Sequence, residues 1–265
     1  MEISGSRVLV TGATGGIGQA IARALHARGA RLVLTGRRGD VLEPLAEELG
    51  ATALAVDLSD AAAVGALPAS AGEIDVLVAN AALPGNGRLD TFTGEQIERV
   101  LDVNLLAPIE LTRALSPGML QRGHGHLVYI SSLSGKTAAA GSSLYNATKF
   151  GLRGFSLAMR EEFHDTGVGV SLVSPGFVRD AGMFADSKVK LPSGVGTKSP
   201  QDVATAVIDA ITKDRAEIDV APIGLRAGAA FAAVAPQTAA RFTRRVGGDK
   251  IADAMATSDN ALIKR

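Results

Sequence analysis

The sequence predicts an α/β fold: a doubly wound parallel sheet of seven strands with helices on both faces and a C-terminal helical extension. Short β-rich runs alternate with helical patterns, and most of the runs are continuously apolar, as in parallel strands covered by helices on both faces. The composition, 46% hydrophobic with 31 glycines and no tryptophan, suits Ala, Val and Leu helices packed on a sheet. A chain of 265 residues can form one such core, so we expect a single domain over residues 1–265.

Seven runs are the strand candidates, in this order: RVLVTG near Val8, RLVLTG near Val33, ATALAV near Leu54, IDVLVAN near Val78, HLVYISS near Val128, VGVSLVSPG near Val170 and AEIDVAP near Ile218. The first helix is expected after the first run, where apolar residues fall at helical spacing: Ile17, Ala20, Ile21, Ala24 and Leu25. A long helical segment is expected from Thr93 toward Arg122. Right-handed crossovers would place the ligand beyond the carboxyl ends of the strands.

Charge and composition argue against several classes of function. The 27 basic residues equal the 27 acidic ones, so no net field would recruit nucleic acid. There is no cysteine, which excludes disulfides and thiolate catalysis, and the four histidines form no ligand-like cluster, so we expect no metal. No run approaches the ~18 apolar residues of a membrane-spanning helix. We therefore expect a cytoplasmic protein without a transmembrane segment.

A glycine-rich loop lies between the first strand and its helix. Gly12 permits a tight turn, Gly16 lets the backbone approach a pyrophosphate, and Gly18 permits close helix packing. The helix N-terminus supplies free N–H groups and a favourable dipole. An ordinary turn is the alternative, which the strand–loop–helix context disfavours. The loop predicts a dinucleotide site that includes Gly12, Thr14, Gly15, Gly16, Ile17 and Gly18.

This TGxxxGxG loop resembles the cofactor signature of the short-chain dehydrogenases/reductases, in their common non-extended branch. Further motifs follow in that family's order: Asp57-Leu58, Asn80-Ala81-Ala82, Asn104, Ser132, Tyr145-Asn146-Ala147-Thr148-Lys149 and Pro175-Gly176. The resemblance covers about Arg7 to Pro222 and implies a Rossmann-type fold that binds a nicotinamide dinucleotide. It also implies cofactor contacts from Asp57, Leu58, Asn80, Ala81, Ala82, Tyr145, Lys149, Pro175, Gly176 and Val178.

Tyr145 and Lys149 are the candidates for the chemistry. They are four residues apart on a predicted helix, so their side chains share one face. A free phenol has a pKa near ~10, and a nearby ammonium favours the phenolate, which would make Tyr145 a usable acid and base. The resemblance implies that Ser132, rather than Ser131, orients the substrate oxygen. It implies that Asn104 supports a proton path through water to the lysine.

The implied reaction moves a hydride between the nicotinamide and a carbonyl carbon, while Tyr145 gives a proton to the oxygen or takes it back. The expected partner is a small carbonyl or alcohol substrate, largely apolar. Three other functions stay open: a dinucleotide-sensing binding protein without turnover, an epimerase on the same scaffold, and a structural interaction module.

The end of the second strand bears on the choice of dinucleotide. Gly36 stands where NAD-preferring relatives have an acidic residue that would bind the ribose 2′-hydroxyl. Arg37 and Arg38 follow and offer cations suited to a 2′-phosphate. NADP(H) is therefore favoured and NAD(H) stays possible, because both arginines could instead cover the adenine edge or begin the next helix.

Two departures from the family's pattern concern the cofactor site. Asp180 stands where relatives have a threonine that contacts the carboxamide, so it either accepts a hydrogen bond there or points to solvent. Ala82 stands where relatives usually have glycine.

The last third of the chain holds the predicted substrate lid, 181–198, and a C-terminal extension, 224–265, of one or two amphipathic helices broken at Pro236. The extension could cap the substrate cleft, pack in a dimer or lie on a membrane surface, and packing on the protein's own body is favoured. We expect a homodimer or homotetramer.

Overall fold

The computed structural model describes residues 1–187, 189, 191 and 195–245. The parts of the predicted lid and extension at 188, 190, 192–194 and 246–265 lie outside the described residues. Seven strands form one parallel sheet in the order β3-β2-β1-β4-β5-β6-β7, which confirms the predicted doubly wound fold. The strands are β1 (Arg7–Thr11), β2 (Arg31–Gly36), β3 (Thr52–Ala55), β4 (Val76–Ala79), β5 (Gly125–Ile130), β6 (Val168–Pro175) and β7 (Glu217–Val220).

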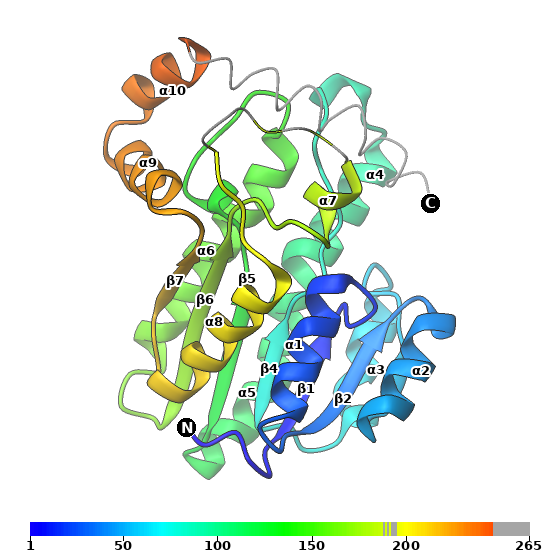
Figure 1. The fold of residues 1–265 in the computed structure, drawn as a ribbon. Coiled ribbons are helices and arrows are strands. Elements are labelled where there is room, and N and C mark those ends of the chain that lie inside the picture. Colours follow the sequence, from blue (N-terminus) through cyan, green and yellow to red (C-terminus); the bar gives the residue numbers. More distant parts are fainter. Residues whose placement is uncertain (188, 190, 192–194, 246–265) are drawn as a thin grey trace.

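Helices connect the strands and cover both faces of the sheet (Figure 1). They are α1 (Gly16–His26), α2 (Gly39–Leu49), α3 (Ala61–Ala71), α4 (Gly94–Leu101), α5 (Ala107–Arg122), α6 (Ser143–Glu162), α7 (Met183–Ser187), α8 (Pro200–Lys213), α9 (Ile223–Val234) and α10 (Pro236–Arg245). Shorter turns are η1 (Leu89–Thr91), η2 (Asp102–Leu106) and η3 (Leu133–Gly135).

Successive residues of a strand enter different cores because strand side chains alternate between the two faces. Val8 and Val10 of β1 pack in the core formed with α1, α2 and α8. Leu9, between them, packs in the core formed with α3, α5 and α6. This double burial is the reason that the strand runs are continuously apolar in the sequence.

Two helical features refine the predictions. The segment expected from Thr93 toward Arg122 is α4 and α5 joined by η2, a π-helical turn that contains Asn104. Up to residue 245, where the described residues end, the extension forms two helices, with α10 beginning at Pro236, where the break was predicted. Among the described helices, none is long and apolar enough to cross a membrane.

The strand order reverses between the neighbouring strands β1 and β4, so the connections after these two strands turn away from each other and leave a crevice at their carboxyl ends. A doubly wound sheet binds its ligand at such a switch point, beyond the carboxyl ends of the strands. The glycine-rich loop follows β1, and Asn80 follows β4. The fold therefore brings these two predicted motifs together.

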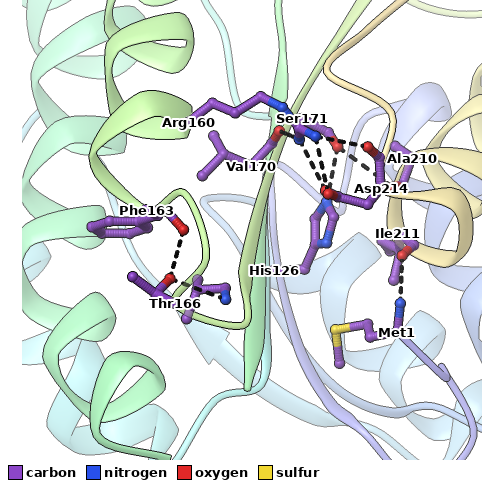
Figure 2. A network of polar contacts seen from close by, with 11 residues as sticks. Met1, His126, Arg160, Phe163, Thr166, Val170, Ser171, Ala210, Ile211 and Asp214 are labelled. Carbon is purple, nitrogen blue, oxygen red and sulfur yellow. Dashed lines mark hydrogen bonds and ion pairs between the residues drawn. The ribbon is translucent and has the colours of Figure 1, made fainter. Parts of the chain in front are cut away.

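A polar network lies at the opposite, amino-terminal end of the sheet (Figure 2). Arg160 of α6 forms an ion pair with Asp214 after α8, at 2.9 Å between Nη1 and Oδ1, and also donates to the backbone of β6. His126 of β5 shares a hydrogen bond of 2.8 Å with Ser171 of β6. The amino group of Met1 donates to a backbone carbonyl of α8. These contacts join the ends of α6, β6 and α8 away from the predicted site.

Candidate active site

One cavity of about 1410 Å³ lies at the carboxyl ends of the strands. It is larger than the ~300–1,000 Å³ of an ordinary small-molecule site, so it has room for a dinucleotide and a second molecule. Nearly all of the predicted site residues line it: Gly12, Thr14, Gly15, Gly16, Ile17, Gly18, Arg37, Arg38, Asp57, Leu58, Asn80, Ala81, Ala82, Ser132, Tyr145, Lys149, Pro175, Gly176 and Val178. Asn104 is the exception and is buried outside the lining.

The glycine-rich loop is fixed against the end of β4. Gly12 has a φ of +65°, and a Cβ built there would lie 2.7 Å from the Ala81 Cα, so the tight turn requires glycine. The Asn80 amide donates to the carbonyls of Thr11 and Gly12, at 3.0 and 3.2 Å. The Asn80 side chain thus holds the loop in place.

The start of α1 is suited to an anion. Its N-cap, Gly15, provides no side-chain cap, and the first turn has no acidic residue. The backbone N–H groups of this turn therefore keep a capacity for phosphate oxygens. Gly16 lies against Ala181, because a Cβ built at Gly16 would come within 2.4 Å of the Ala181 Cβ. Close approach of the segment after β6 is thus a second reason for glycine at this position.

Two arginines line the cavity after β2. Arg37 Nη1 lies 3.9 Å from Asp57 Oδ2, and Arg38 donates to the Thr14 carbonyl at the glycine-rich loop. Burial acts to raise the pKa of Asp57, but hydrogen bonds from Ser59 and the charges of Arg99 and Arg37 outweigh it, so this pKa is lowered. Arg99 Nη2 lies 3.1 Å from the same carboxylate but is not a lining residue.

Tyr145 and Lys149 lie one turn apart on α6, as predicted. The Lys149 Nζ is 5.6 Å from the centre of the Tyr145 ring and donates to the carbonyl of Ile130 at 3.0 Å. Lys149 is only 2% exposed, and this burial lowers its pKa to about 8. The pair therefore places an ammonium beside a phenol, shielded from solvent.

The two serines after β5 differ in their contacts. The Ser132 Oγ accepts a hydrogen bond from the backbone N–H of Ser134, at 3.1 Å. The Ser131 Oγ is buried and donates to the Lys149 carbonyl, at 3.3 Å. Ser131 thereby links β5 to α6, and the hydroxyl of Ser132 keeps its proton as a donor for a ligand in the cavity.

Asn104 lies in the π-helical turn and joins three elements. Its Oδ1 accepts from the Leu83 N–H at 2.7 Å, and its Nδ2 donates to the Leu83 carbonyl at 2.9 Å. The same Nδ2 lies 3.3 Å from the Oγ1 of Thr148, next to Lys149. These contacts make Asn104 a buried brace between the loop after β4 and α6.

A group of charged residues beside the candidate catalytic residues was not predicted from the sequence. The Lys136 Nζ lies 2.7 Å from Asp219 Oδ1, and the Arg153 Nε lies 2.6 Å from Glu217 Oε1. Both cations line the cavity, and both anions come from β7. The sequence signal for their place near the site is their spacing from predicted site residues: Lys136 is four residues after Ser132, and Arg153 is four residues after Lys149.

Asn146, inside the motif that carries Tyr145 and Lys149, was also missed. Its Nδ2 donates to the carbonyls of Ser134 and Thr137, at 2.6 and 2.7 Å. It therefore fixes the loop that follows Ser132.

Asp180 lies away from the cavity lining, with a φ of +68° and an ion pair to Arg179 at 3.4 Å. Of the two alternatives for this residue, the structure has the one in which the side chain points to solvent. The described residues include no group of three or more His, Asp or Glu side chains placed to bind a metal.

Comparison with known sequences is consistent with this geometry. Residues 6–191 match the profile of the short chain dehydrogenase family. The ketoacyl reductase HetN of Nostoc sp. is 39% identical over 227 residues, which cover 82% of this chain and 79% of that protein. The NADP-dependent 3-hydroxy acid dehydrogenase YdfG of Escherichia coli is 37% identical over 215 residues, covering 76% of this chain and 86% of that protein.

Solved structures agree in fold. A short-chain dehydrogenase from Sphingobium yanoikuyae in complex with NADPH superposes with a TM-score of 0.74 at 29% identity, covering 81% of this chain and 87% of that one. A metagenomic short-chain oxidoreductase in complex with NADP gives a TM-score of 0.70 at 35% identity, covering 84% of this chain and 99% of that one. The chain therefore belongs to the short-chain dehydrogenase/reductase family of oxidoreductases.

Proposed function

We propose that this protein interconverts a carbonyl and a secondary alcohol with NADP(H), using Tyr145 as the acid and base. The observation that carries the proposal is the position of Tyr145 and Lys149 on one face of α6, in the same cavity as the glycine-rich loop. If Tyr145 only packed in the core and Lys149 were only a surface charge, the ammonium of Lys149 would not need to be buried beside the Tyr145 ring.

The residues present fit a dinucleotide. The uncapped start of α1 suits its pyrophosphate, and the cavity is large enough for both cofactor and substrate. The nicotinamide, when bound, accepts or gives the hydride. Gly15 to Gly18, the loop after β4 and the segment from Pro175 to Val178 would hold the dinucleotide.

The chain's own residues handle the proton. In reduction, the Tyr145 hydroxyl gives its proton to the substrate oxygen as the carbon gains the hydride, and in oxidation the phenolate takes that proton back. Lys149 stabilises the phenolate electrostatically, and the Ser132 hydroxyl orients the oxygen. Asn104 acts through its brace on Leu83 and Thr148, which keeps α6 in register with the loop after β4.

NADP(H) is the proposed dinucleotide. Support comes from Arg37 and Arg38 at the rim of the cavity, from the absence of an acidic side chain at Gly36, and from the NADP-dependent relative and the NADP(H) complexes among similar structures.

Arg37→Ala and Arg99→Ala form a matched pair for testing this choice, because both remove a charge beside Asp57 and only Arg37 lines the cavity. In fluorescence titrations, Arg37→Ala should weaken NADPH binding about tenfold or more and leave NADH binding unchanged. Arg99→Ala should change neither. Equal losses of NADPH and NADH binding in Arg37→Ala would refute the phosphate contact.

NADPH oxidation with a panel of carbonyl compounds tests the reaction. Tyr145→Phe should lower kcat/KM by about 10²–10⁴ while NADPH binding is retained. Stoichiometric loss of NADPH distinguishes net redox chemistry from epimerisation, which regenerates its cofactor. Tight NADPH binding without turnover of any compound would instead indicate a dinucleotide sensor, and binding of neither dinucleotide would indicate an interaction module.

The similar proteins suggest where the carbonyl lies. One is named a ketoacyl reductase and another a 3-hydroxy acid dehydrogenase, so we place the reacting oxygen on the third carbon of an acyl compound.

We also propose a cytoplasmic homodimer or homotetramer. Leu106 of η2 is an exposed apolar side chain outside the cavity lining and is suited to an interface. Leu106→Arg should lower the mass measured by light scattering.

A further inference from the structure

The two C-terminal helices form part of the cavity that holds the catalytic residues. In α9, the lining residues include Leu225, Ala229, Ala232 and Ala233, and in α10 they include Ala240. Figure 1 shows both helices beyond the carboxyl end of β7, on the other side of the strand ends from α7. The described part of the extension thus lines the cavity.

The lining face of α9 is an apolar stripe in which most side chains are small. Leu225, Ala229 and Ala232 recur at spacings of four and three residues, which is the period of one helix face. Arg226 and Ala230 are exposed and lie outside the lining. Across the same cavity, α7 contributes Phe184, whose ring packs 5.0 Å from that of Phe177. Phe231 of α9 also lines the cavity, so a mostly small, apolar wall on α9 faces the aromatic rings of Phe177 and Phe184 across a space suited to an apolar group.

The two cations beside β7 that line the cavity are already paired. Lys136 and Arg153 are paired with the carboxylates of Asp219 and Glu217 at hydrogen-bonding distance. Binding a second anion there would require breaking a partly buried ion pair. The distal part of a ligand therefore meets apolar surface on α9 and α10.

We propose that α9 and α10 bind an unbranched alkyl chain of the substrate, with the reacting carbonyl held at Tyr145. This rests on the proposed carbonyl chemistry and adds the class of substrate. From Leu225 to Ala233 the stripe extends about 12 Å, at about 1.5 Å per residue. An extended polypeptide advances about 3.6 Å per residue, which is about 1.2 Å for each of its three backbone bonds. At the same advance per bond, an extended alkyl chain of about ten carbons matches the length of the stripe.

The test is a calorimetric titration of NADPH-loaded protein with 2-alkanols of increasing length. These alcohols cannot react, because both the alcohol and the cofactor are in the reduced state. The Kd should fall about two- to fourfold for each added methylene and level off near about ten carbons. A Kd independent of chain length would overturn the proposal.

Ala232→Leu and Ala230→Leu are the matched variants, because they make the same change two residues apart on α9 and only Ala232 lines the cavity. Leucine is a good helix former, so both should keep the wild-type melting temperature. Ala232→Leu should raise the Kd of long alcohols about tenfold and leave the Kd of short ones unchanged, whereas Ala230→Leu should bind all of them like the wild type. Equal binding by both variants would contradict the chain site.

Oxidation of NADPH by a short 3-oxoacyl thioester separates this inference from the proposed function. Turnover of that compound without any dependence of alcohol binding on chain length would refute the alkyl site alone. If alcohol binding depends on chain length but the thioester is not turned over, the proposed reaction is refuted and the alkyl site is supported.

Discussion

Lys149 and His126 are buried titratable side chains at opposite ends of the sheet, and burial lowers the pKa of each. Lys149 has a pKa of about 8 and lies in the cavity. His126 has a pKa of about 4 and lies in the network at the amino ends of β5 and β6 (Figure 2). The first shift bears on catalysis and the second on stability.

Lys149→Met should lower kcat/KM for carbonyl reduction by about 10²–10⁴ near neutral pH, because the phenolate loses its stabilising charge. In the wild type, the lowered pKa means that the ammonium loses its proton as pH rises through about 8. Reduction should therefore decline above about pH 8, since a neutral lysine no longer stabilises the phenolate that forms when Tyr145 gives its proton to the substrate. Rates measured from about pH 6 to 10 check this.

Lys213→Met is the control, because Lys213 is an exposed lysine paired with Asp209 on α8. It should keep the wild-type rate and pH profile. A Lys149→Met enzyme with the wild-type profile would show that the charge of Lys149 has no part in the chemistry.

His126 should make the fold less stable in acid. Its pKa is about 4 in the folded protein, because burial disfavours the charged ring, against ~6.5 when unfolded. Between these values the unfolded chain binds a proton that the folded one does not. The free energy of unfolding should therefore fall by up to about 1.4 kcal/mol per pH unit as pH drops from about 6.5 to 4.

Urea unfolding at several pH values measures this slope in wild type and His126→Gln, which should lose that part of the dependence. His164→Asn is the control, because His164 is exposed and lies beside the same network. An unchanged slope in His126→Gln would assign the acid sensitivity to other groups.

At the scale of elements, the π-helical turn η2 decides where Asn104 points. A π-helix widens the turn by one residue and is frequent at functional sites. The turn directs the Asn104 amide to both backbone groups of Leu83 and to Thr148. The position of α6 relative to the loop after β4 thus depends on one side chain.

Asn104→Ala should cost about 2–4 kcal/mol in the free energy of unfolding, because it leaves the buried N–H and C=O of Leu83 without their partner. It should also lower kcat by shifting α6, whereas Asn104→Asp, which keeps the acceptor, should retain part of the stability. Urea unfolding and kcat are the measurements. Gln96→Ala, at the exposed cap of α4, should cost less than about 1 kcal/mol and leave kcat unchanged. A stable Asn104→Ala protein would contradict the brace.

The five inner strands were predictable because they are buried on both faces and so leave continuous apolar runs, whereas the edge strands β3 and β7 are only partly buried. The glycine-rich loop and the Tyr145–Lys149 pair were predictable because their spacing is local. The π-turn was not, since one added residue hardly alters the helical period of the segment. The pairing of Lys136 and Arg153 with β7 was also missed, because their partners lie 83 and 64 residues away along the chain.

At the scale of the whole molecule, these long-range ion pairs connect the edge strand β7 to α6 and to the segment after η3. Lys136 follows η3, Arg153 is on α6, and their partners Asp219 and Glu217 are on β7. The Lys136 side chain is 10% exposed, so its charge is largely removed from water. Removing one partner of such a partly buried ion pair lowers the free energy of unfolding, because the other charge is left without compensation.

Lys136→Met should lower the free energy of unfolding by about 1–3 kcal/mol, because Asp219 is left without its nearest cation. Adding Asp219→Leu should restore part of the loss, since the uncompensated charge is then gone. Thermal unfolding of the single and double variants measures both effects. Lys213→Met, which breaks an exposed pair, should cost less than about 0.5 kcal/mol. Equal losses in the two lysine variants would show that burial of the Lys136 pair has no energetic weight.

The close contact between the end of β2 and the glycine-rich loop limits which side chains can stand at Gly36. A Cβ at Gly36 would lie 2.7 Å from the Cγ2 of Thr14, whose side chain is branched and buried. An acidic residue at Gly36 therefore cannot be accommodated until Thr14 has become smaller or changed its rotamer. The side chains that fit at Gly36 thus depend on the residue and rotamer at position 14, so a substitution at one of these two neighbouring loops alters what the other can hold.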